Sequence, residues 1–150
     1  MREVATIGYQ AATVRTFLEA LTEHRVDLLV DVRAVASSRR PGFAKSALAA
    51  NLQGAGIEYL HLRGLGTPAE GRAAARAGRH AEMREIFLEH LATPGARAEL
   101  EALAEIVRSG RRVCLLCLEA DPTHCHRSLV ATALTAMVPM RVIHLTPAES

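Results

Sequence analysis

Short strand patterns alternate with helical patterns along most of this 150-residue chain. The runs VDLLVDV (residues 26–32) and RRVCLLC (residues 111–117) are apolar at most positions, as is typical of strands covered on both faces of a parallel sheet. Strands that alternate with helices imply right-handed crossovers and helices on both faces of the sheet. The sequence therefore predicts an α/β fold with a mostly parallel, Rossmann-like sheet.

The individual elements follow from the period of the apolar residues and from glycine and proline breaks. Strands are expected at residues 3–7, 26–32, 57–62, 111–117 and 140–145. Helices are expected from about Val14, over 44–53, roughly over 81–92 and 95–109, and over 126–137. Residues 64–80 show no clear apolar face and are expected to form a mobile loop or a short exposed helix.

Composition narrows the class of protein. Hydrophobic residues make up 49% and charged residues 23%, which fits one globular domain over residues 1–150. A net charge of +2 is too small for a protein that coats nucleic acid, although an acidic ligand fits it. The sequence shows no signal peptide or membrane span, so we expect a cytoplasmic protein without a membrane partner, and its three cysteines are expected to be reduced. Its oligomeric state is not determined by the sequence.

Reactive side chains follow the predicted strands. In a doubly wound sheet, ligands bind beyond the carboxyl ends of the strands. The residues expected at this edge are Thr6, Gly8 and Tyr9, then Asp31 and Arg33, then His61 and Arg63, and finally Cys117 and Glu119. The fourth predicted strand also leads into the segment CLEADPTHCHR (residues 117–127), which is rich in thiol, imidazole and carboxyl groups.

Several of these stretches occur together in a known family. TIGY, LLVDVRAVASSRRPGF, IEYLHLRGLG and LLCLEADPTHCHRSLVATAL resemble the bacterial and archaeal domain of unknown function family numbered 488, over nearly the whole chain. The resemblance implies a compact α/β fold but no reaction. It marks as signature positions Asp31, Arg33, Cys117, Glu119, Cys125, His126 and Arg127.

Cys125 is the candidate nucleophile. It lies at the expected start of the last helix, where unpaired N–H groups and cationic neighbours favour a thiolate. His126 is the candidate acid or base, and Glu119 and Asp31 complete the candidate catalytic set. The alternative is that the Cys125 thiol merely fills space in the core, as free cysteines often do.

An anion is the expected ligand of this site. A helix N-terminus binds phosphate or carboxylate, and Arg33 and Arg127 can add charge-assisted hydrogen bonds. Cys117, Gly8 and Tyr9 are the other residues assigned to substrate binding. The expected ligand is phosphate, a nucleotide or another phosphorylated molecule, with nucleic acid as a further candidate. Alternatively, Arg127 forms a structural ion pair with Asp31 or Glu119, or the pocket belongs to a non-catalytic binding module.

No metal or other cofactor is expected. Cys114 and Cys117 are three positions apart in one strand, so their side chains point to opposite faces and cannot bind one ion together. Cys117, Cys125 and one histidine still offer three ligands, which leaves a metal-dependent hydrolase as an alternative.

Overall fold

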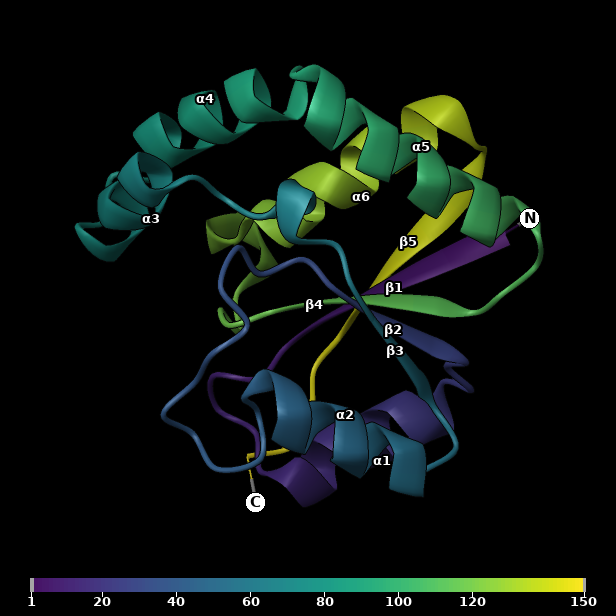
Figure 1. Ribbon diagram of the computed structural model, residues 1–150. Coiled ribbons are helices and arrows are strands. Elements are labelled where there is room, and N and C mark those ends of the chain that lie inside the picture. The colour runs from purple at the N-terminus through teal and green to yellow at the C-terminus, as the bar shows by residue number, and fades with distance from the viewer. Residues whose placement is uncertain (1, 150) are drawn as a thin grey trace.

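The computed structural model describes residues 2–149 and contains one sheet with the strand order β3-β2-β4-β1-β5 (Figure 1). All four neighbouring strand pairs are parallel, which confirms the predicted α/β architecture. The strands are β1 (Arg2–Gly8), β2 (Leu28–Asp31), β3 (Glu58–His61), β4 (Val113–Cys117) and β5 (Met140–Leu145).

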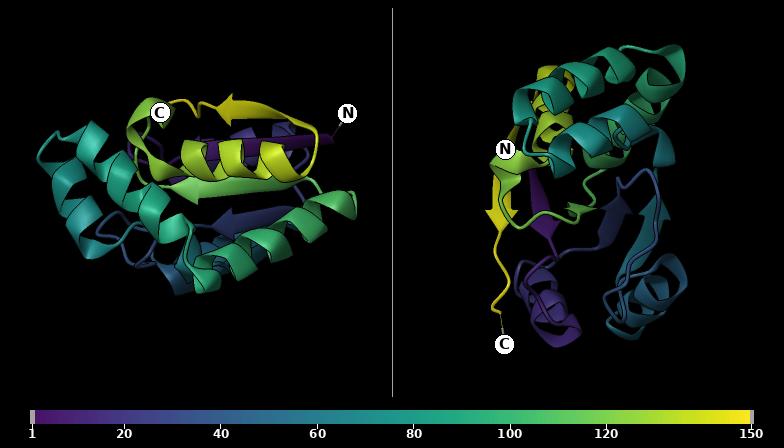
Figure 2. Two further views of the ribbon diagram at one scale, coloured as in Figure 1. Left: turned by 90° about the horizontal axis from the view of Figure 1, so that it is seen from above. Right: turned by 90° about the vertical axis from the view of Figure 1, so that its left-hand side faces the viewer.

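Helices cover both faces of the sheet. On one face lie α1 (Val14–Glu23) and α2 (Lys45–Gly54), and on the other lie α5 (Pro94–Arg108) and α6 (His126–Met137). Two further helices, α3 (Ala69–Arg76) and α4 (His80–Leu91), extend past the carboxyl edge of the sheet (Figure 2). The longest helix within residues 2–149 is α5, with 15 residues, and no helix there is long and apolar enough to cross a bilayer.

The apolar strands are explained by these two layers of helices. Leu29, Cys114 and Leu116 belong to the core beneath α1 and α2, whereas Val30 and Leu115 belong to the core beneath α5 and α6. Alternate side chains of a strand point to opposite faces, so a strand with a core on each side is apolar at every position. Cys114 is therefore a core residue on the face opposite α6, as the strand alternation predicts.

Residues 64–80 form defined secondary structure. A 3₁₀ turn, η1 (Arg63–Leu65), is followed by α3, so the short helix was the correct one of the two expectations. Gly66 allows the segment between η1 and α3 to pass close to Ala34, because a Cβ atom at Gly66 would lie 2.2 Å from the backbone nitrogen of Ala34.

The direction of the crossovers reverses around β4. This strand lies between β1 and β2, whose following helices α1 and α2 are on one face, whereas its own following helix α6 is on the other. Loops after neighbouring strands therefore diverge and leave a crevice at the carboxyl end of β4. A 3₁₀ turn, η2 (Pro122–His124), leads from this crevice into α6 and is capped by the Asp121 carboxylate, as expected for an Asp-Pro pair.

Candidate functional site

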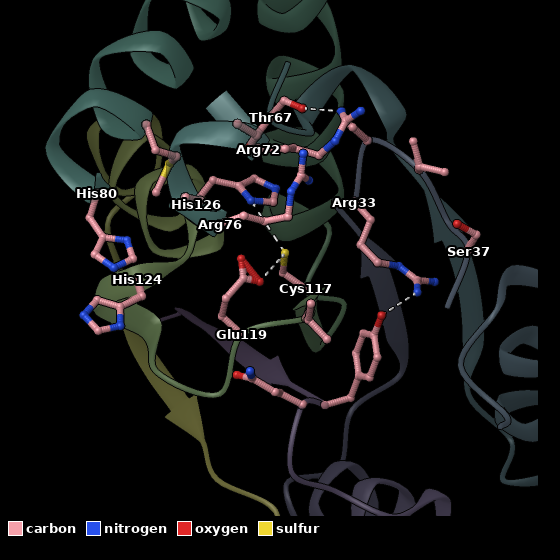
Figure 3. A pocket seen from close by; sticks show the side chains of 17 residues that line it. Arg33, Ser37, Thr67, Arg72, Arg76, His80, Cys117, Glu119, His124 and His126 are labelled. Carbon is pink, nitrogen blue, oxygen red and sulfur yellow. Dashed lines mark hydrogen bonds between the residues drawn. The ribbon is translucent and has the colours of Figure 1, made fainter. Parts of the chain in front are cut away.

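A pocket with a volume of about 370 Å³ opens at the carboxyl end of β4 (Figure 3). Its walls come from the segments that follow β1, β2 and β4, from α3 and α4, and from the start of α6. Of the residues expected at the site from the sequence, the pocket is lined by Tyr9, Arg33, Cys117, Glu119 and His126. A crevice at this place is where ligands bind in doubly wound sheets.

A cluster of two thiols and one imidazole lies at this pocket. His126 Nδ1 is 3.6 Å from Cys117 Sγ and 3.9 Å from Cys125 Sγ. The three side chains are buried, with exposed fractions of 5% for Cys117, 2% for Cys125 and 5% for His126. Cys117 and His126 line the pocket, but Cys125 does not. The predicted start of the last helix is confirmed, because Cys125 is the N-cap residue of α6.

The backbone fixes the orientation of the His126 ring. His126 Nε2 lies 2.6 Å from the carbonyl oxygen of Val32, which follows β2. A carbonyl oxygen only accepts, so Nε2 carries a hydrogen and donates it to Val32. In the neutral ring the lone pair is then on Nδ1, which faces the two sulfur atoms. The imidazole can therefore accept a proton from a thiol or bind a metal ion at Nδ1.

Neighbouring charges favour a thiolate in the cluster. Burial opposes ionisation of Cys125, but hydrogen bonds from Cys117 and His126 and the charge of Arg127 hold the pKa of Cys125 well below its usual range. The hydrogen bond to Cys125 and burial raise the pKa of Cys117. Burial lowers the pKa of His126, but its hydrogen bond to the Cys125 sulfur, the charges of Cys125 and Glu119, and the hydrogen bond to Val32 together raise that pKa above its usual value. The neighbours of the two thiols therefore shift their pKa values in opposite directions, with Cys125 favoured as the thiolate.

Glu119 supplies a carboxyl group beside the cluster. Its Oε2 is 3.8 Å from Cys117 Sγ, and the side chain lines the pocket. Burial and the charge on Cys125 raise the pKa of Glu119. A carboxyl in this position can take up a proton and release it again.

Asp31 and Arg33 form a buried ion pair. Arg33 Nε and Nη2 donate to the two carboxylate oxygens of Asp31 at 2.9 and 2.6 Å, and the Tyr59 hydroxyl donates to Asp31 at 2.6 Å. Arg33 Nη1 also donates to the Tyr9 hydroxyl and the Phe43 carbonyl. Asp31 does not line the pocket. These contacts are those of a structural ion pair. A catalytic role of Asp31 and anion binding by Arg33 stay predictions.

Arg127 and Gly8 shape the loop after β4. Arg127 is fully buried and donates to the backbone carbonyls of Glu119 and Ala120, not to a carboxylate. A Cβ atom on Gly8 would lie 1.8 Å from the same Glu119 carbonyl oxygen. Neither residue lines the pocket, so their predicted contacts with substrate would require a different route of access. Arg127 instead fixes the segment that carries Glu119 by hydrogen bonds, and Gly8 leaves room for that segment to pass close to β1.

Four basic residues that line the pocket were not among the predicted site residues. They are Arg72, Arg76, His80 and His124. Arg72 Nη1 donates to the Thr67 carbonyl at 2.9 Å, while Arg76 forms no hydrogen bond or ion pair with other residues in the range 2–149. The rings of His80 and His124 stack with centroids 4.1 Å apart. The four-residue spacing of Arg72 and Arg76 was the available signal, because it places both on one face of a helix.

The fold and the site define a doubly wound α/β protein with a Cys/His cluster at the carboxyl edge of its sheet. The chain belongs to the family described as "Domain of unknown function DUF488", whose family model matches residues 13–134. This confirms the resemblance found in its motifs, and the description states no activity. No curated protein and no solved structure matches the chain.

Proposed function

We propose that this protein is an enzyme that acts on a small anionic substrate. Its reacting groups are Cys117, Cys125 and His126, with Glu119 as the neighbouring acid or base. The observation that supports this most directly is the position of the thiol–imidazole cluster, which is buried on the protein side and borders an open pocket. The reaction class is hydrolysis or group transfer at an electrophilic centre of the substrate.

The energetic cost of the cluster supports a reactive role. Buried polar and charged groups cost free energy unless they are paired, and a hydrophobic residue would fill the same space more cheaply. In this cluster the pKa values of Cys125 and of Cys117, His126 and Glu119 are shifted in opposite directions by their neighbours. Groups with shifted pKa values that meet in a cleft are typical of active sites.

Three arginine side chains at the pocket support the proposal that the substrate is an anion. Arg72 and Arg76 project from α3 over the pocket, and Arg33 borders it on the β2 side (Figure 3). Guanidinium groups bind phosphate and carboxylate through paired hydrogen bonds. The volume of about 370 Å³ is in the range of small-molecule sites, about 300 to 1,000 Å³, and favours a phosphorylated metabolite or a single nucleotide.

The binding part of this proposal is tested by thermal shift with inorganic phosphate and with AMP. We expect both to stabilise the wild-type protein, and we expect the Arg72→Ala/Arg76→Ala double variant to lose that stabilisation. Arg84→Ala is the matched control, because Arg84 is an exposed arginine of α4 that does not line the pocket. Equal responses of the wild type and the double variant would contradict anion binding at this wall.

The catalytic part is tested by hydrolysis of p-nitrophenyl phosphate, bis(p-nitrophenyl) phosphate and p-nitrophenyl acetate. We expect turnover of at least one of them to fall roughly 100-fold or more in Cys117→Ala and His126→Ala, since each removes a reacting group. Cys114→Ala should retain it, because Cys114 lies on the opposite face of the sheet. Anion binding through Arg72 and Arg76 without turnover of all three compounds would favour a non-catalytic binding module.

A further inference from the structure

The ligand atoms of Cys117, Cys125 and His126 are spaced like three corners of a metal-binding tetrahedron. A zinc site with Zn–S bonds of about 2.3 Å and a Zn–N bond of about 2.0 to 2.1 Å has S–N edges of about 3.5 to 3.6 Å and an S–S edge of about 3.8 Å. The S–N distances are 3.6 and 3.9 Å, and all three ligand atoms lie within 4.8 Å of one another. The two S–N distances therefore lie close to the S–N edges of such a zinc site.

We infer that Cys117, Cys125 and His126 bind one zinc ion whose fourth position opens into the pocket. Two thiolates and one imidazole are soft and borderline ligands of the kind that select zinc over magnesium or calcium. The inference deepens the proposed function, since it concerns the same cluster and states how that cluster activates its reaction partner.

The contact with Val32 supports His126 as a ligand. Histidines that bind metal ions usually donate their other ring N–H to a carbonyl or carboxylate, which orients the ring and makes it a better ligand. His126 makes this contact through Nε2 at 2.6 Å, so its Nδ1 lone pair faces the two sulfur atoms. The ring is thus held in the orientation that metal binding needs.

The charges around the cluster also fit a divalent cation. Arg127 is fully buried beside it, and Glu119 borders it. With both thiols ionised, the formal charges of zinc, the two thiolates, Arg127 and the Glu119 carboxylate cancel. A neutral set of groups is the arrangement that burial favours.

The fourth position is left for water or substrate. Within residues 2–149, the cluster contains only these three Cys, His, Asp or Glu side chains. Glu119 Oε2 is 3.8 Å from Cys117 Sγ and borders the pocket, which places it beside the ligands. Three protein ligands with an open fourth position are typical of catalytic zinc sites, which lower the pKa of bound water to about 7.

This arrangement defines a hydrolytic step. The zinc-bound water transfers a proton to the Glu119 carboxylate, and the resulting hydroxide forms a new bond to the electrophilic atom of the substrate. The bond to the leaving group then breaks, and its electron pair stays with the leaving group, which takes the proton from Glu119. The balance is one water consumed for one bond cleaved, with no change of oxidation state.

The inference is tested by elemental analysis of untagged protein that has been loaded with zinc chloride and freed of unbound metal by gel filtration. We expect about one zinc per chain, as for a single site with three protein ligands. Cys117→Ser and Cys125→Ser should lose the metal, whereas Cys114→Ala should keep it. Glu119→Gln should also keep it while losing turnover, because Glu119 is the proton acceptor and not a ligand.

Cobalt gives a second measurement that does not depend on folding of the variants. Cobalt(II) added to the metal-free wild type should produce a thiolate-to-metal charge-transfer band and the intense visible bands of a tetrahedral site, and zinc should abolish both. The inference is overturned if the wild type holds no more zinc than a buffer blank and cobalt gives no such bands. It is also overturned if both serine variants retain zinc.

These outcomes are separate from those of the proposed function. Zinc binding without turnover of the three p-nitrophenyl compounds would support the metal site and contradict the proposed enzymatic function. Turnover that occurs without zinc and is blocked by iodoacetamide would support an enzyme whose nucleophile is a thiolate. The same result would contradict the inferred zinc site.

Discussion

His126 Nε2 is hydrogen-bonded at 2.6 Å to the carbonyl oxygen of Val32, a residue 94 positions earlier in the chain. This bond connects the segment after β2 with the first residue of α6. Val32 is itself held by β4, because its backbone N–H donates to the Leu116 carbonyl at 3.2 Å. The orientation of the imidazole is therefore set by the sheet backbone.

A slowly exchanging ring proton should report this contact. His126 is buried, so its Nε2–H should give a ring N–H signal in ¹⁵N-edited NMR that persists in water at neutral pH. His61 also bonds a backbone carbonyl, that of Arg33 at 2.7 Å, but it is more exposed, and its ring proton should exchange faster. The His126→Asn variant assigns the signal. A His126 ring proton that exchanges as fast as that of His61 would contradict the orientation.

Thiol labelling should follow access to the pocket. In protein freed of metal, limiting iodoacetamide should label Cys117 first, because Cys117 lines the pocket and Cys125 does not, and this access outweighs the raised pKa of Cys117 and the lowered pKa of Cys125. Cys114 should stay unlabelled, since it is fully enclosed and burial raises the pKa of its thiol. Peptide mapping by mass spectrometry distinguishes the three sites. Labelling mainly at Cys125 would instead support the nucleophile expected from the sequence.

Breaking the Asp31–Arg33 ion pair should strongly destabilise the protein. Arg33→Met leaves the Asp31 carboxylate buried without its partner, a change that costs about 3 to 5 kcal/mol. Arg33→Lys should not restore stability, because an ammonium group cannot replace the two-pronged contact with Asp31. The free energy of unfolding in urea measures both changes.

Arg84→Met is the control for the ion pair, since an exposed arginine should change that free energy by less than about 0.5 kcal/mol. If Arg33→Met kept full stability but abolished phosphate binding, Arg33 would be an anion ligand, as the sequence analysis predicted.

The fold could be predicted from the sequence because its signals are local. The run RRVCLLC is apolar at most positions since β4 has a core on each face, and Asp121-Pro122 specifies a turn by its own chemistry. The parallel sheet and the start of α6 at His126 follow from such patterns.

The site could be predicted only in part, because its decisive contacts join distant residues. Cys117 and Glu119 were predicted to border a crevice because they lie at the carboxyl end of a predicted strand. No local pattern shows that a backbone carbonyl orients His126, or that the hydroxyl of Tyr59 completes the environment of Asp31. Arg127 was expected to bind the substrate anion, with an ion pair to a carboxylate as the alternative, whereas it donates to backbone carbonyls of the loop after β4. A side chain's partner depends on the final packing.

Gly8 should tolerate no side chain. It pairs with Cys117 across β1 and β4, and an added Cβ would lie 1.8 Å from the Glu119 carbonyl oxygen, so the loop that carries Glu119 must move. We expect Gly8→Ala to lower the melting temperature and to weaken zinc binding. Gly54→Ala is the matched control, because no atom lies within 4 Å of the new methyl group and alanine favours a helix by up to about 1 kcal/mol. Equal melting temperatures for the two variants would contradict the close approach.

The raised pKa of Tyr59 should make the protein less stable at alkaline pH. Partial burial and the hydrogen bond to Asp31 raise the pKa of the Tyr59 hydroxyl, because a phenolate would lie in a half-buried place beside a carboxylate. In the unfolded chain Tyr59 loses its proton near pH 10, while in the folded protein it keeps the proton to a higher pH. Between these two pKa values the folded state binds more protons, so the free energy of unfolding falls as the pH rises above about 10.

Tyr59→Phe isolates this contribution. The variant lacks the ionisable hydroxyl, so its free energy of unfolding should fall less steeply between about pH 10 and 11 than that of the wild type. At neutral pH it should be less stable by about 1 to 3 kcal/mol, because the charged Asp31 carboxylate loses one of its hydrogen bonds. Urea titrations at closely spaced pH values measure both effects. Parallel curves for the two proteins above pH 10 would show that the Tyr59 hydroxyl ionises as readily in the folded state as in the unfolded one, and would contradict its bond to Asp31.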